Sequence, residues 1–184
     1  MTGKKLTILS SDLSVVGFPR SGNTFLHYCN YLSYKLKEPQ KHKLSGKALN
    51  ECEYIITPLR DPLECISSRI ETPIDPSVVD PFIKFYIRFM ETAKANKDKI
   101  LFLDFEKFKD DVNYVHQAIF EKFGITPLAY PAVDKIKEEM LKRDLTNNLP
   151  GDFEFNNREE ARNYIRNHQD YQYCLDLYSE LLPK

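Results

Sequence analysis

Apolar residues along the chain fall either in short continuous runs or in stripes at helical spacing. Runs at 53–59 and 100–105, and a run that ends at Gly17, predict buried strands. The stripes predict helices over 22–37, 63–70, 82–93, 112–123 and 132–143, and two helices in the last segment that meet near 168–170. Pro73, Pro76 and Pro81 predict a loop before the stripe at 82–93.

Strands that alternate with helices predict an α/β protein, in which helices cover both faces of a central, mostly parallel sheet. We therefore expect a three-layer sandwich, formed as a single domain by residues 1–184. In such sheets ligands bind at the carboxyl ends of the strands. The stretches with candidate chemistry end strands or follow them, which favours one site.

Composition narrows the function classes without naming one. The chain has 184 residues and a net charge of -1, so nothing predicts a nucleic-acid partner or an anionic membrane surface. Its first apolar run is too short for a signal peptide or a membrane span, and we expect a soluble, cytoplasmic protein. The four cysteines are widely spaced, which favours reduced core thiols over a zinc site or disulfides.

The segment from Gly17 to Thr24 has the pattern of a strand, a short loop and the start of a helix. Backbone N–H groups in such a loop, with the amino end of the helix, favour an anion, and the Ser21 and Thr24 hydroxyls add donors. Gly17 and Gly22 have the spacing of a nucleotide-binding P-loop, but Asn23 stands where that loop has lysine. The cation, Arg20, lies inside the loop instead.

The stretch Phe18-Pro19-Arg20-Ser21-Gly22-Asn23-Thr24 resembles the 5′-phosphosulfate loop of sulfotransferases that use 3′-phosphoadenosine 5′-phosphosulfate (PAPS). The resemblance covers about residues 13 to 124. It implies the P-loop NTPase-like sulfotransferase fold and transfer of a sulfuryl group to a hydroxyl or amine, with adenosine 3′,5′-bisphosphate (PAP) as product. It also implies that no metal is required.

The same resemblance implies that the loop amides, Gly22 included, hold the donor's 5′-phosphate together with Ser21, Asn23 and Thr24. It also assigns roles to residues outside the loop. Arg60 and Ser68 match the Arg and Ser that hold the donor's 3′-phosphate, and Phe25 and Phe105 match positions that stack on adenine. Ordinary alternatives remain for each: an ion pair of Arg60 with its neighbour Asp61, and core packing of the two rings.

Catalysis is assigned to Arg20 and His42. Arg20 would balance charge on the bridging oxygen, and His42 lies where similar enzymes have the base that deprotonates the acceptor, although Gln40 and Lys41 differ from the family's Lys-Thr. A solvated surface histidine is the alternative for His42.

One departure from the family concerns the end of the chain. The Arg-Lys-Gly segment with which many cytosolic sulfotransferases close the donor site is absent, and Arg143, Arg158 and Arg162 are the candidates to replace it.

Two other functions compete with the sulfotransferase. One is a divergent P-loop nucleotide kinase, which Asn23 disfavours, and the other is a non-catalytic PAP-binding protein of the same fold. The expected partner of the enzyme is a small-molecule or glycan acceptor, whose identity the sequence leaves open, as it does the oligomeric state.

Overall fold

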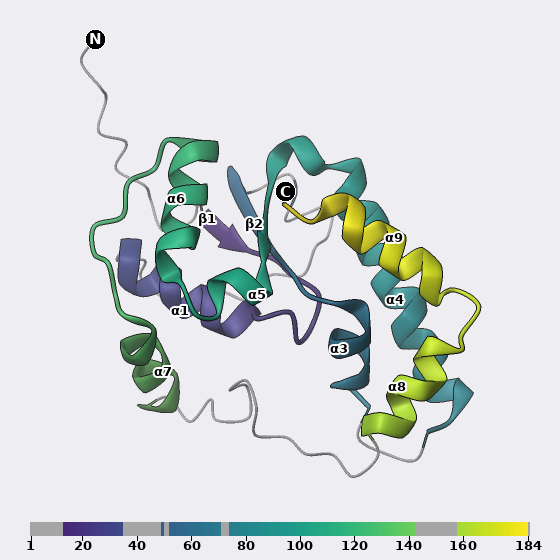
Figure 1. The fold of residues 1–184 in the computed structure, drawn as a ribbon. Coiled ribbons are helices and arrows are strands. Elements are labelled where there is room, and N and C mark those ends of the chain that lie inside the picture. Colours follow the sequence, from purple (N-terminus) through teal and green to yellow (C-terminus); the bar gives the residue numbers. More distant parts are fainter. Residues whose placement is uncertain (1–12, 35–48, 50–51, 71–73, 143–157, 184) are drawn as a thin grey trace.

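The computed structural model describes residues 13–34, 49, 52–70, 74–142 and 158–183 (Figure 1). Within them the protein is α/β, with a small open sheet of three parallel strands in the order β1-β2-β3. The strands are β1 (Leu13–Val15), β2 (Tyr54–Leu59) and β3 (Ile100–Asp104). The helices are α1 (Asn23–Tyr34), α3 (Pro62–Ser67), α4 (Pro76–Ala95), α5 (Phe105–Phe108), α6 (Val112–Phe123), α7 (Val133–Lys142), α8 (Arg158–Arg166) and α9 (Tyr171–Leu181), with a 3-10 turn η1 (Lys97–Lys99).

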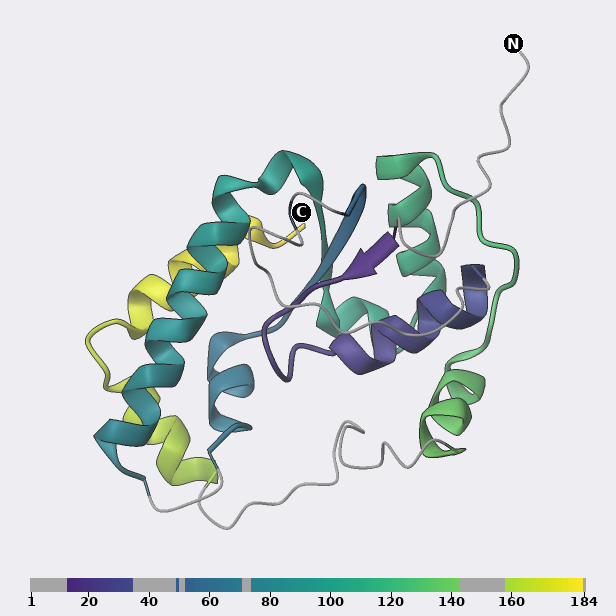
Figure 2. The ribbon, with the colours of Figure 1, turned by 180° about the vertical axis from the view of Figure 1, so that it is seen from behind.

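Side chains of the central strand β2 point alternately to two separate cores. Ile55 and Leu59 join the core formed with α3, α4, α8 and α9, whereas Ile56 joins the core formed with α1, α5, α6 and α7. Both faces of β2 are thus buried, which explains why its sequence is continuously apolar. Figure 2 shows the molecule from behind, where α4 and α9 again lie side by side on one side of the sheet. The expectation of an α/β protein with helices on both faces of a parallel sheet is confirmed.

A proline ends the pairing between β1 and β2. The Val16 N–H donates to Ile56 O at 2.8 Å, so Ile56 faces β1, and by the alternation of the strand Pro58 faces the same way. Pro58 has no N–H to offer a longer β1. A Cβ on Gly17 would lie 2.8 Å from the Pro58 ring, so the two backbones are close where the chain leaves the sheet.

The prediction of a loop at Pro76 and Pro81 is wrong, because both residues lie in α4. Asp75 caps this helix by accepting the Ser77 N–H, and Pro76 occupies its first position, where no intrahelical donor is needed. Pro81 lies in the second turn and removes only one hydrogen bond, to the carbonyl of Ser77. Pro73 lies outside the described residues.

The other predicted helices agree with the structure to within a few residues. Gly124 ends α6 in the left-handed conformation with φ 70°, as a glycine stop should. The last described segment is indeed two helices, with His168 between α8 and α9. Three of the cysteines are buried and all four are free thiols, in agreement with the prediction.

Candidate functional site

The loop after β1, the residue after β2 and the first residue after β3 meet at one edge of the sheet. This is the carboxyl edge of all three strands, since the strands are parallel. A Cβ on Gly22 would lie 2.6 Å from Cδ2 of Phe105, and the guanidinium of Arg60 lies 4.5 Å from the centre of the Phe105 ring. Gly22, Arg60 and Phe105 therefore belong to one site, as the sequence predicts for candidate residues at strand ends.

The loop backbone has two left-handed residues. Arg20 has φ 66° and Gly22 has φ 95°, and Arg20 alone has this conformation among the described residues other than glycine. Left-handed backbone costs an L-residue about 1–2 kcal/mol. Strain of this kind gathers at ligand-binding loops, where alternating backbone conformations turn successive N–H groups toward one concave side.

Two polar side chains of the loop hold the loop itself. The Ser21 hydroxyl, which is buried, donates to Phe18 O at 2.6 Å. The Asn23 amide Nδ2 donates to Gly17 O at 3.0 Å and to Phe18 O at 2.8 Å. The first turn of α1, which contains the buried Thr24, begins with backbone N–H groups that have no partner within the helix and can face an anion.

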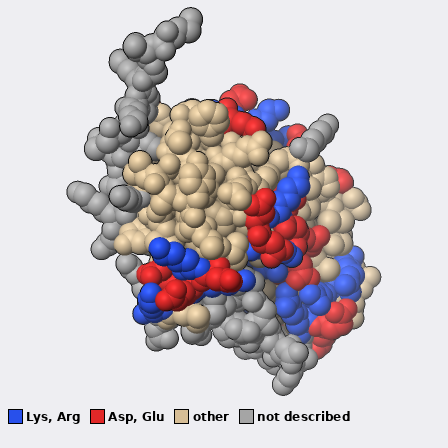
Figure 3. All heavy atoms as spheres, turned by 60° about the vertical axis from the view of Figure 1, so that its left-hand side comes forward, with Lys and Arg blue, Asp and Glu red and all other residues tan. Residues whose placement is uncertain are grey.

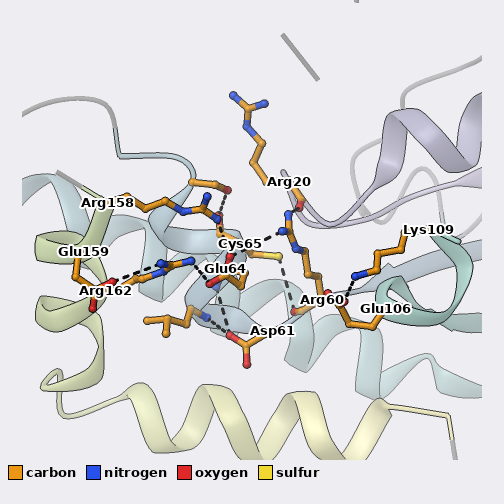
Figure 4. Close-up of polar contacts among 12 residues, drawn as sticks. Arg20, Arg60, Asp61, Glu64, Cys65, Glu106, Lys109, Arg158, Glu159 and Arg162 are labelled. Atoms are coloured by element: carbon orange, nitrogen blue, oxygen red, sulfur yellow. Dashed lines mark hydrogen bonds and ion pairs between the residues drawn. The ribbon is translucent and has the colours of Figure 1, made fainter. Parts of the chain in front are cut away.

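Arg60 connects the loop to α3. Its Nη1 donates to Arg20 O at 3.0 Å, and its Nη2 lies 3.8 Å from Glu64 Oε2 (Figure 4). Asp61, the alternative ion-pair partner, is instead the cap of α3 and accepts the N–H groups of Leu63 and Glu64. Arg60 is thus placed by the loop carbonyl and by the face of Phe105.

Ser68 lies at the far end of α3 from Arg60. It is the residue after the last turn, and its hydroxyl donates to Cys65 O at 3.0 Å. Because an α-helix rises about 1.5 Å per residue, the backbone at the two ends of this helix is roughly 10 Å apart. The Arg60 side chain runs along α3 as far as Glu64, one turn before Ser68, and the shared role of Arg60 and Ser68 stays a prediction.

The two candidate stacking rings are both buried. Phe25 stacks on Phe108 with ring centres 6.1 Å apart and belongs to the core beneath α1. Phe105 contacts Phe108 edge-on and has Arg60 over its face. Core packing accounts for Phe25, while Phe105 also forms a wall of the site.

Glu64 and two arginines of α8 are part of the same region. Arg158 Nη2 donates to Glu64 Oε2 and Arg162 Nη2 donates to Glu64 Oε1, each at 2.6 Å. The sequence predicts Arg158 and Arg162 as candidates to replace the family's Arg-Lys-Gly segment. No pattern in the sequence points to Glu64. The signal in the sequence was the spacing of four residues between Arg158 and Arg162, which places both side chains on one face of a helix.

His42 and Arg143 lie outside the described residues. Cys65 is buried, and burial raises the pKa of its thiol well above the usual value, although Arg60 acts the other way. The thiol therefore stays protonated and is no nucleophile at neutral pH.

No cluster of three or more His, Cys, Asp or Glu residues in the described part of the chain is placed to hold a metal ion. Likewise, no described helix combines the length and the apolar composition needed to cross a membrane.

A separate pocket of about 370 Å³ lies against α6, where His116, Phe120 and Tyr130 line it. Figure 3 shows a largely uncharged area in the upper middle of the side that carries α6, with charged side chains below it, to its right and at the upper edge. His116, which lines this pocket, contacts Ser33 near the carboxyl end of α1. The loop that contains Arg20 and Gly22 precedes the amino end of the same helix. The pocket is therefore not part of the site around Arg60.

Comparison with known proteins leaves the family open. No family model matches the chain, and no curated protein matches it. The resemblance to sulfotransferases consequently depends on this chain's own residues, above all those of the loop and Arg60.

Proposed function

We propose that the protein is a sulfotransferase that moves a sulfuryl group from PAPS to a hydroxyl or amine of a small-molecule or glycan acceptor. The observation that carries the proposal is the loop: a cation, Arg20, in left-handed backbone, with Gly22 beside it and Asn23 at the start of α1. Backbone N–H groups of the loop and the first turn of α1 bind the 5′-phosphate.

The chemistry is an in-line displacement at sulfur. The bond between sulfur and the bridging oxygen of the 5′-phosphate breaks as the acceptor oxygen or nitrogen bonds to sulfur, and the electron pair of the broken bond stays on PAP. Arg20 stabilises the charge that grows on the bridging oxygen. The acceptor proton goes to a base, which the resemblance assigns to His42.

Asn23 is the feature that separates this proposal from a nucleotide kinase. A P-loop kinase has a lysine at this position to bind the β and γ phosphates. Here the side-chain amide turns back to the Gly17 and Phe18 carbonyls, and so supports the backbone rather than a triphosphate. A non-catalytic PAP-binding protein would have the same loop and would differ in lacking turnover.

Calorimetry and a transfer assay test the proposal together. We expect PAP to bind at least about tenfold more tightly than adenosine 5′-phosphate, because a charged hydrogen bond to the 3′-phosphate is worth roughly 1.5–3 kcal/mol. ATP with Mg²⁺ should bind more weakly than PAP. Tight binding of ATP with Mg²⁺ and none of PAP would favour the kinase.

Turnover is measured as PAP release from PAPS with a panel of phenols, alcohols and amino sugars. Arg20→Ala should lower it by on the order of a hundredfold while PAP still binds, and Arg20→Lys should keep part of it. His42→Ala should lower it by about 10²–10⁴-fold. Wild-type protein that binds PAP and releases none from PAPS with any acceptor would favour the binding protein.

A further inference from the structure

Glu64 is held by arginines from two parts of the chain. Both of its carboxylate oxygens accept hydrogen bonds from α8, one from Arg158 and one from Arg162, and Arg60 approaches from the side of the loop (Figure 4). The four side chains are 20–29% exposed, so the cluster is only partly buried.

The charges in this cluster do not balance. Three guanidinium groups face the Glu64 carboxylate, and a second carboxylate, Glu159, is shared between Arg162 and Arg166. The Nε–H groups of Arg60, Arg158 and Arg162 are buried with no hydrogen-bond partner among the described residues. Buried donors without acceptors are rare, and charged ones are the most costly, so this cluster has unused capacity for an anion.

The cluster lies one side chain away from the loop. The guanidinium of Arg60 donates to the Arg20 carbonyl through Nη1 and faces the Glu64 carboxylate through Nη2. In PAP both phosphates are attached to the same ribose, so groups that bind them must also be neighbours. An anion in the cluster and a phosphate in the loop meet this condition.

We propose that Arg158 and Arg162, with Arg60, bind the 3′-phosphate of the donor, and that Glu64 is an internal anion which this phosphate replaces. The inference rests on the proposed function. In the free protein Glu64 keeps the arginines converged. A phosphate monoester brings more charge and a third oxygen, and therefore satisfies donors that one carboxylate leaves without a partner.

The exchange makes opposite predictions for the two kinds of residue. Arg158→Gln and Arg162→Gln should each weaken PAP binding by about tenfold to a hundredfold, because a charged contact is lost. Glu64→Gln should tighten PAP binding by about threefold to tenfold, because the competing ion pairs are gone. None of the three should change the affinity for adenosine 5′-phosphate by more than about twofold.

Arg166→Gln is the matched control. Arg166 lies on the same helix, but pairs with Glu159 and Asn163 rather than with Glu64. It should leave PAP binding within about twofold of wild type. Circular dichroism of each variant checks that the helix content, and with it the fold, is that of wild type.

A measurement on the wild-type protein needs no variant. The ¹⁵N resonances of the Arg158 and Arg162 Nε–H groups, which are buried and without a partner in the free protein, should shift with saturating PAP but not with adenosine 5′-phosphate.

The outcomes separate the two proposals. Wild-type protein that does not bind PAP overturns the proposed function. Wild-type protein that binds PAP, with unaltered affinity in Arg158→Gln and Arg162→Gln or with no gain in Glu64→Gln, overturns only the exchange.

Discussion

Gly22→Ala should destabilise the protein for two reasons, backbone strain and steric overlap of the new Cβ, which a second variant can separate. Alanine at φ 95° has the strain of left-handed backbone, about 1–2 kcal/mol, offset by about 0.4–1 kcal/mol from the lower entropy of the unfolded chain. Its Cβ would also lie 2.6 Å from Phe105 Cδ2 and 2.9 Å from Phe108 Cζ. Both rings are buried and cannot swing away, so this overlap adds about 1–3 kcal/mol.

Gly124→Ala isolates the first contribution. Gly124 has φ 70°, and a Cβ built there meets no atom within 4 Å. In urea unfolding, Gly22→Ala should therefore lower the free energy of unfolding by about 1–3 kcal/mol more than Gly124→Ala does. Equal losses in the two variants would refute the close packing of the loop on Phe105 and Phe108, and with it the placement of the loop against the end of β3.

Two further predictions concern polar groups. Asn23→Asp places a carboxylate against the carbonyls of Gly17 and Phe18 and removes both donors, so the free energy of urea unfolding should fall by at least about 2 kcal/mol; an unchanged value would contradict the role of Asn23 in the loop. Burial lowers the pKa of His116, so its contribution to stability is complete above about pH 6.5 and is lost as the pH falls, because the unfolded chain takes up the proton first. The unfolding free energy should thus drop between pH 7 and pH 5 in wild type and less steeply in His116→Gln, and parallel curves would contradict this.

Local patterns were enough for most helices and strands but not for the prolines before α4. An Asp-Pro pair marks a turn, and it equally marks the cap and first position of a helix. Asp75 and Pro76 are the second case. Which one applies depends on the stripe that follows, and in α4 that stripe begins at Val79, before Pro81.

The site was predictable only for the residues that directly follow strands. The loop, Arg60 and Phe105 follow strands, and the rule for parallel sheets brings them to one edge. Glu64 and Arg158 are 94 residues apart, and no periodicity links them. The spacing of Ser68 from Arg60 matches a motif, but the spacing does not reveal that the Ser68 hydroxyl donates to Cys65 O of α3.

Pro58 means that the loop cannot be understood as a local peptide structure. The chain leaves β1 where Pro58 of the neighbouring strand has no N–H to donate. The Thr57 hydroxyl donates to Val16 O instead, from a residue 41 positions further along the chain. An excised peptide of the loop and α1 would have neither the missing donor nor the ring of Pro58 beside it. The loop therefore leaves β1 at a point that depends on β2, and a ligand that binds the loop also reports on the pairing of these two strands.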